Sequence, residues 1–123
     1  MPVRLYSLKT SHPAHAVRGM LEHKGIEFEV RELTPGLHPI QLRLARFTGP
    51  TVPGLLLEGE RVQGSRRISR ALDRHRPSPP LFPVQPERRR AVEEAERWGE
   101  EDLQAVPRRL FRWATVQDRE LRE

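Results

Sequence analysis

The side chains of this 123-residue chain that could take part in chemistry are hydroxyls and imidazoles, because the sequence contains no cysteine. Without a thiol, the chain itself forms neither a disulfide nor a reactive thiolate. His12 and His15 are three residues apart, a spacing that could serve a metal ion, but no acid or thiol lies near them in sequence. We therefore predict no metal site. Two serines, Ser11 and Ser65, stand at candidate helix starts, where a hydroxyl can bond to free backbone N–H groups.

The first of these serines follows a short predicted strand. Residues 3–8 read as a strand and residues 9–13 as a turn. A helix is predicted over residues 14–23. It is expected to end there because Gly25 is the residue type found just past a helix end. An alternating strand follows over residues 27–31. This βαβ order places Ser11 at the end of the loop that leads into the helix, where its hydroxyl can act as a cap.

The second serine lies in a segment that begins with a proline. Pro53 precedes an apolar run, and a proline there costs no ladder hydrogen bond because it stands at the first residue of a strand or at an edge. Residues 52–57 and 61–62 are predicted to pair as a hairpin across an acidic, glycine-containing turn. Ser65 is expected to cap a helix over residues 65–74 through its own hydroxyl.

The remaining sequence predicts a crossover helix, a linker and a long helix. Residues 40–44 are enough for a short helix that returns the chain to the sheet. Residues 77–83 contain four prolines and read as a stiff linker. Pro86 suits the first position of a helix. The apolar residues of that helix recur mainly at three- and four-residue steps, and Pro107 should kink or split it; they are Ala91, Ala95, Trp98, Leu103, Val106 and Leu110.

The pattern from Tyr6 to Glu29 resembles the opening of glutathione transferases of the zeta and omega type, with Lys24-Gly25-Ile26 closing the helix. Val52-Pro53, the hairpin and the helix at Ser65 resemble the second half of the same amino-terminal domain. The resemblance implies an α/β, thioredoxin-like fold of order βαβ-α-ββα, followed by a proline-rich linker and one or two helices. It divides the chain into a glutathione-binding-type domain over 1–77, a linker over 78–86, and the truncated start of an all-α carboxy-terminal domain over 87–123.

The resemblance also implies a site. Ser11 falls where the family places a catalytic serine or cysteine, whose hydrogen bond to the glutathione sulfur lowers the pKa of that thiol. Val52 and Pro53 would hold the cysteinyl backbone, and the peptide bond between them is predicted to be cis. Gly64 and Ser65 would meet the γ-glutamyl end at the start of a helix.

Two residues depart from the family pattern at this site. Gly64 stands where relatives usually carry Glu or Gln, and Arg67 stands where they tend to have a small residue. The loss of the acidic or amide side chain at Gly64 weakens the predicted grip on the amino group of the ligand and puts glutathione affinity in question.

The sequence therefore supports two interpretations of function. The first is a bacterial, cytoplasmic transferase-like enzyme that conjugates glutathione, as co-substrate, to a small electrophile. The alternative is a non-catalytic relative that keeps the fold as a binding or interaction module with weak or no glutathione affinity. Three features favour the alternative: Gly64, the lack of the further helices of an all-α domain, and the lack of cysteine. Two features favour the enzyme: the resemblance from Tyr6 to Glu29, which runs without a gap, and Ser65.

The composition also bears on partners. No stretch of 18 apolar residues predicts a membrane span. Residues 1–86 carry 13 basic and 7 acidic side chains, but no aromatic residues interleave with the basic ones as stacking on nucleic acid requires, so nucleic acid is not a predicted partner. A homodimer is predicted, in which the arginine-rich helix 65–74 of one copy faces the glutamate-rich helix 87–105 of the other.

Overall fold

The computed structural model describes residues 2–122, and the side chains in that range except residues 111 and 115–122. Met1 and Glu123, the outermost residues of the two predicted domains, lie outside the described residues. The chain forms two compact units, residues 1–81 and 82–123, which are described separately. The elements are β1 (Arg4–Ser7), α1 (His12–His23), β2 (Glu29–Glu32), α2 (His38–Leu44), β3 (Gly54–Leu57), β4 (Glu60–Gln63), α3 (Ser65–His75), α4 (Pro86–Trp98), a π-helical turn η1 (Gly99–Leu103) and α5 (Ala105–Arg122).

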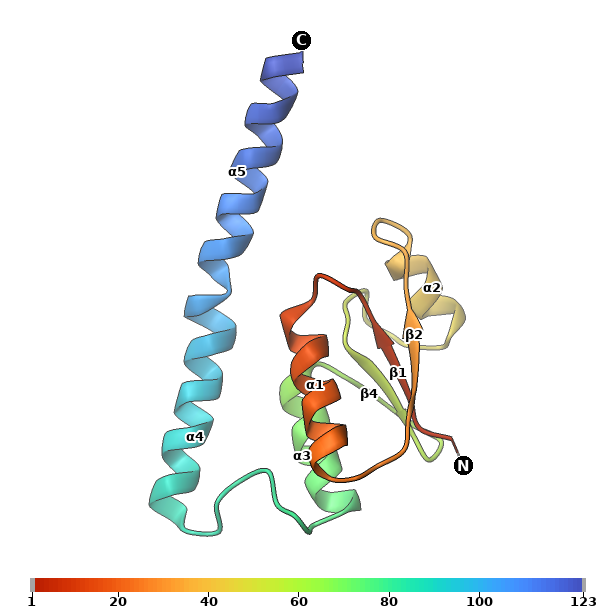
Figure 1. Ribbon diagram of the computed structural model, residues 1–123, viewed down its shortest axis with the longest axis vertical. Coiled ribbons are helices and arrows are strands. Elements are labelled where there is room, and N and C mark those ends of the chain that lie inside the picture. The colour runs from red at the N-terminus through yellow and green to blue at the C-terminus, as the bar shows by residue number, and fades with distance from the viewer. Residues whose placement is uncertain (1, 123) are drawn as a thin grey trace. The chain divides into compact units, whose positions relative to one another are not determined.

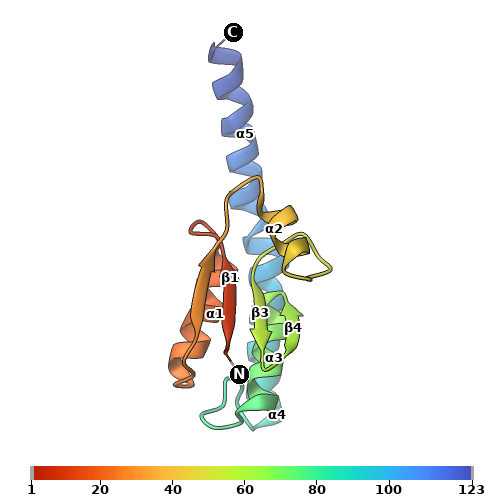
Figure 2. The same ribbon diagram turned by 90° about the vertical axis from the view of Figure 1, so that its right-hand side faces the viewer.

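The first unit is built on a four-stranded mixed sheet with strand order β2-β1-β3-β4. β1 pairs with β2 in parallel, and β3 is antiparallel to both β1 and β4. Helices α1 and α3 lie side by side on one face of the sheet, and α2 lies on the opposite side (Figures 1 and 2). This is the βαβ-α-ββα order predicted from the sequence, and the thioredoxin-like fold is confirmed.

The β3–β4 hairpin turns at the acidic, glycine-containing segment, as predicted. Glu58 and Gly59 both have positive φ, 48° and 87°. A two-residue turn of this kind matches the right-handed twist of the paired strands, which ordinary type I and II turns would splay. The turn fixes the register in which Leu55 lies opposite Val62.

The apolar core lies between the sheet and the α1–α3 pair. Alternation along β1 directs Leu5 into this core and Tyr6 to the other face, where its ring meets Phe47 edge-on with centroids 5.2 Å apart. The core draws on β1, α1, β3, β4 and α3, and its buried members are Val3, Leu5, Val17, Leu21, Leu55, Leu57, Val62, Ile68, Ala71 and Leu72.

A fully buried lysine joins the carboxy-terminal ends of α1 and α3. The Nζ atom of Lys24 lies 2.7 Å from Oδ1 of Asp73 and donates hydrogen bonds to the carbonyl oxygens of Arg76 and Pro79. Asp73 also accepts the backbone N–H of Leu81 at 2.9 Å. All three donors of the ammonium group therefore have acceptors, as a desolvated charge requires. This Lys24 node ties residues 76–81 to the two helices.

The second unit is a helix that changes its winding near the middle. The backbone N–H of Gln104 bonds to the carbonyl of Gly99 at 3.1 Å, which is the five-residue spacing of a π turn. α5 then starts at Ala105, so Pro107 falls in its first turn, where a missing N–H is tolerated. The sequence-based prediction that the long helix is interrupted near Pro107 is confirmed. No helix among the described residues combines the length and apolarity needed to cross a bilayer.

We expect Lys24→Met to lower the free energy of unfolding of the first unit by about 3–5 kcal/mol, because it leaves the Asp73 carboxylate without its buried cation. Urea denaturation followed by circular dichroism measures the change. The matched control is Arg18→Met on the same helix, whose ion pair with Glu22 is exposed and should contribute about 1 kcal/mol or less. Equal losses in the two variants would contradict the role assigned to the Lys24 node.

Candidate functional site

The predicted site residues come together at one end of the sheet. β1 ends at Ser7 and leads through a short loop to Ser11. β3 begins beside it, since Tyr6 is paired with Gly54, the residue after Pro53. The backbone N–H of Gly64 donates to the carbonyl of Pro53 at 3.0 Å, which places the start of α3 next to the same proline.

Ser11 is the N-cap of α1. Its Oγ atom accepts the backbone N–H of Ala14 at 3.3 Å, and the backbone of Ser11 is extended as a cap requires. Pro13 occupies the first turn of the helix, where its missing N–H costs nothing. Within residues 2–122, no acceptor is found for the hydroxyl hydrogen of Ser11. The hydroxyl can therefore cap the helix and still donate outward.

The start of α3 differs from the prediction that Ser65 is its cap. That prediction is wrong, because Gly64 is the N-cap, with φ at 89°, and no side chain caps the helix. A positive φ strains any residue with a Cβ, which accounts for glycine at this position. Ser65 is the first helical residue, and it lies among backbone N–H groups that have no partner within the helix.

The Val52–Pro53 peptide bond is cis, as predicted, and Pro53 is fully buried. The next residue, Gly54, packs directly against the Phe47 ring, since a Cβ there would lie 3.1 Å from two ring atoms. Glycine at this position lets β3 run close beneath the ring.

Gln63 holds the loop that precedes the cis-proline, a role that the sequence analysis missed. Its Oε1 atom accepts the N–H of Gly49 at 2.8 Å, while its Nε2 atom donates to the carbonyls of Gly49 at 2.8 Å and Thr51 at 3.1 Å. A Cβ on Gly49 would lie 3.0 Å from Oε1 of Gln63, so a larger residue there would push the Gln63 amide away from this position. The only feature of the sequence that pointed to a role for Gln63 was its position just before Gly64.

The arrangement can receive an anionic ligand. α1 and α3 run side by side, with their carboxy-terminal ends joined at the Lys24 node, so both amino-terminal ends point toward the same end of the sheet (Figure 1). Each helix start carries a partial positive charge and free N–H groups. The described residues contain no cluster of three or more side chains suited to hold a metal ion.

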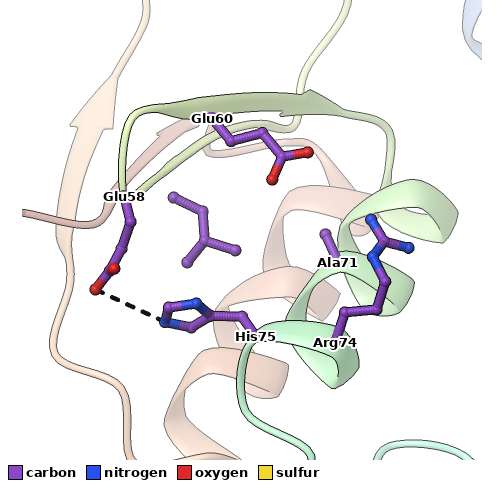
Figure 3. A pocket seen from close by; sticks show the side chains of 6 residues that line it. Glu58, Glu60, Ala71, Arg74 and His75 are labelled. Carbon is purple, nitrogen blue, oxygen red and sulfur yellow. Dashed lines mark ion pairs between the residues drawn. The ribbon is translucent and has the colours of Figure 1, made fainter.

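A pocket of about 330 Å³ lies at the opposite end of α3 and contains none of the predicted site residues (Figure 3). Nε2 of His75 lies 3.8 Å from Oε1 of Glu58 across this pocket. The β3–β4 turn and the last turn of α3 form its walls, and the lining residues are Leu57, Glu58, Glu60, Ala71, Arg74 and His75.

Comparisons with known proteins agree on one family. The family model for the glutathione S-transferase N-terminal domain matches residues 5–80. No curated protein matches the sequence significantly.

Solved structures show the same likeness. The Tau class glutathione S-transferase of mango (Mangifera indica) is similar at 22% identity and a TM-score of 0.75, over 82% of this chain and 46% of its own. A Burkholderia glutathione transferase homologue with bound glutathione matches at 24% and 0.70, over 88% and 58%. A glutathione S-transferase from Methylobacterium radiotolerans in complex with glutathione sulfonate matches at 31% and 0.64, over 76% and 44%. The chain thus spans about half the length of these proteins.

We expect Gln63→Leu to free the loop at Gly49, because the substitution removes three hydrogen bonds and keeps a similar volume. The amide hydrogen of Gly49 should exchange at least about tenfold faster, with a stability loss of about 1–3 kcal/mol. Hydrogen exchange followed by NMR measures this. Gln41→Leu is the matched control, because Gln41 bonds to a different loop amide, that of Thr34. Unchanged protection at Gly49 in the Gln63 variant would show that the loop is held by other contacts.

Proposed function

The chain belongs to the glutathione S-transferase family, and from this premise we propose that its amino-terminal unit binds glutathione and activates the thiol for attack on a small electrophile. The observation that carries the proposal is the convergence of two helix starts, those of α1 and α3, on the loop that contains Pro53. Glutathione has carboxylates and a thiol that ionises, and both are favoured by N–H groups at a helix start.

In this proposal, the backbone of Val52 and Pro53 binds the cysteinyl part of glutathione. Ser65 and the N–H groups of the first turn of α3 receive the γ-glutamyl carboxylate. Gly64 holds the chain in the conformation that presents these groups, since its φ of 89° suits glycine. The sulfur then lies near Ser11, whose hydroxyl donates a hydrogen bond to the thiolate.

Ser11 would contribute by lowering the pKa of the bound thiol from its ordinary value near 8.5. A thiol becomes a nucleophile when it loses its proton, and a hydrogen-bond donor favours the ionised form. The start of α1 adds a field of the same sign. The thiolate would form a bond to carbon of the electrophile and displace its leaving group, which departs with the electron pair.

A non-catalytic binding module is the second candidate. Gly64 offers no side chain to the amino group of glutathione, and no acidic residue lies in the first turn of α3. A site with two positive helix starts and few acidic partners favours the carboxylates over the ammonium group. Both candidates therefore predict weak glutathione binding, and they differ in whether conjugation follows.

The other parts of the proposal concern the setting of the protein. The bacterial origin, the cytoplasmic location, the small electrophile and the homodimer stay predictions. The chain spans about half the length of the similar structures. The activity of the whole protein is therefore proposed from its amino-terminal unit.

We expect isothermal titration with glutathione to show weak binding that Ser65→Ala reduces by about tenfold, because one hydrogen bond to a charged group is lost. Ser78→Ala is the control, since Ser78 is exposed in the linker. No heat change at high millimolar glutathione would contradict the binding site itself. Equal affinity of the two variants for glutathione would exclude only Ser65 from the binding site.

We expect Ser11→Ala to reduce conjugation of a simple aromatic electrophile by about 10²–10³-fold, the usual cost of losing one donor to a developing or stabilised anion. Loss of the cap should also lower stability by about 1 kcal/mol. Ser11→Gly separates the two effects, because glycine at a helix N-cap costs only a few tenths of a kcal/mol and lacks the donor. Ser11→Thr should retain both functions. Conjugation by Ser11→Ala at the wild-type rate would leave Ser11 as a cap alone.

A further inference from the structure

The acidic side chains of the first unit are unevenly distributed between the two ends of its sheet. The candidate glutathione site lies at the end where β1 stops and β3 begins, which we call the site end. The opposite end holds the β3–β4 turn and the last turns of α1 and α3. Six of the seven acidic side chains in residues 2–81 lie toward this opposite end: Glu22, Glu27, Glu29, Glu58, Glu60 and Asp73.

Most of these six carboxylates already have a basic partner. Figure 3 shows one such pair, beside the pocket at the opposite end of α3. The ion pairs within 4 Å are Arg4–Glu29, Arg18–Glu22, Lys24–Asp73 and His75–Glu58. A ligand bound at the site end is therefore remote from these carboxylates.

Glu32 is the exception, but it lies on the wrong side of the sheet. It is paired with Ser7 at the end of the edge strand β2, and β1 and β3 separate it from β4, which leads into α3. Three strand spacings amount to about 14 Å. Exposed charges are largely screened beyond about 8 Å at physiological salt. The exposed carboxylate of Glu32 therefore exerts little attraction at the start of α3.

The start of α3 is cationic. Arg66 and Arg67 are the second and third residues of the helix, and its first turn contains no acidic residue. The Arg67 side chain is exposed to solvent. The helix start adds a partial positive charge of its own. Because the N-cap is Gly64, no side chain at that position can accept a hydrogen bond from a ligand. This surrounding favours a carboxylate and repels an ammonium group.

Glutathione brings both of these charges to the same place, because the α-carboxylate and the α-ammonium group of its γ-glutamyl residue are bonded to one carbon atom. We propose that the site prefers a thiol whose terminal carboxylate stands on a carbon without an ammonium group. The simplest member of this class is glutaryl-cysteinyl-glycine, in which hydrogen replaces the ammonium group. The inference rests on the proposed function, since it names the ligand class that the same site prefers.

Isothermal titration at neutral pH and low ionic strength compares glutathione with glutaryl-cysteinyl-glycine. The second thiol should bind about tenfold more tightly, because it keeps both carboxylates and lacks the ammonium group that the helix start and two guanidinium groups repel. Raising the salt concentration to roughly 0.5 M should narrow the difference, since the charges are exposed. Equal or tighter binding of glutathione at low ionic strength would overturn the proposal.

Arg67→Glu tests the electrostatic origin of the preference by placing a carboxylate in the first turn of α3. Both thiols should bind less tightly, but the ratio of their affinities should shift about tenfold in favour of glutathione. Arg74→Glu is the matched control, because it makes the same charge change at an exposed position seven residues, or about 10 Å, further along the helix. It should leave the ratio unchanged. Circular dichroism checks that both variants are folded, and equal ratios in the two would contradict the proposal.

The outcomes separate this inference from the proposed function. Binding of neither thiol to the wild-type chain would contradict both. Binding of glutathione in preference to glutaryl-cysteinyl-glycine would leave the proposed function standing and overturn only the inference. Ser65→Ala should weaken the two thiols about equally, because its hydroxyl meets the carboxylate that they share. A loss confined to glutathione would mean that the two thiols bind differently, and would also overturn the inference.

Discussion

A buried ammonium ion must be surrounded by acceptors, and the first unit is arranged so that Lys24 has them. The carboxylate of Asp73 and two backbone carbonyls from residues 76 and 79 supply its three hydrogen bonds. Arg76 returns a bond to the carbonyl of Lys24 at 2.9 Å. These contacts hold the last turns of α1 and α3 together, and because both helices are rigid, their first turns are held together as well.

The consequence for function appears at the far end of the two helices. The starts of α1 and α3 are brought to the loop around Pro53, and Gln63 fixes that loop through three hydrogen bonds. The candidate site thus consists of backbone N–H groups and hydroxyls on rigid elements, with few titratable side chains. Such a site suits a ligand that brings its own charge and its own nucleophile.

The second unit follows a different principle. The first unit buries its apolar side chains within itself, whereas the described side chains of α4, η1 and α5 leave several large apolar ones exposed. A single helix has no interior, so these apolar side chains have no core of their own to enter. The π turn over Gly99–Leu103 separates the two α-helical parts of this unit.

The sequence by itself determined the features that depend on neighbouring residues. Alternation, glycine and proline positions predicted the strands, the turn at Glu58 and Gly59, the helix end at Gly25 and the interruption near Pro107. The tertiary structure alone decided the contacts between distant segments. The burial of Lys24, the three bonds of Gln63 and the cap at Gly64 join residues that are far apart in sequence or depend on a backbone angle. A residue's local pattern carries no record of such partners, because their proximity is a product of packing the whole unit.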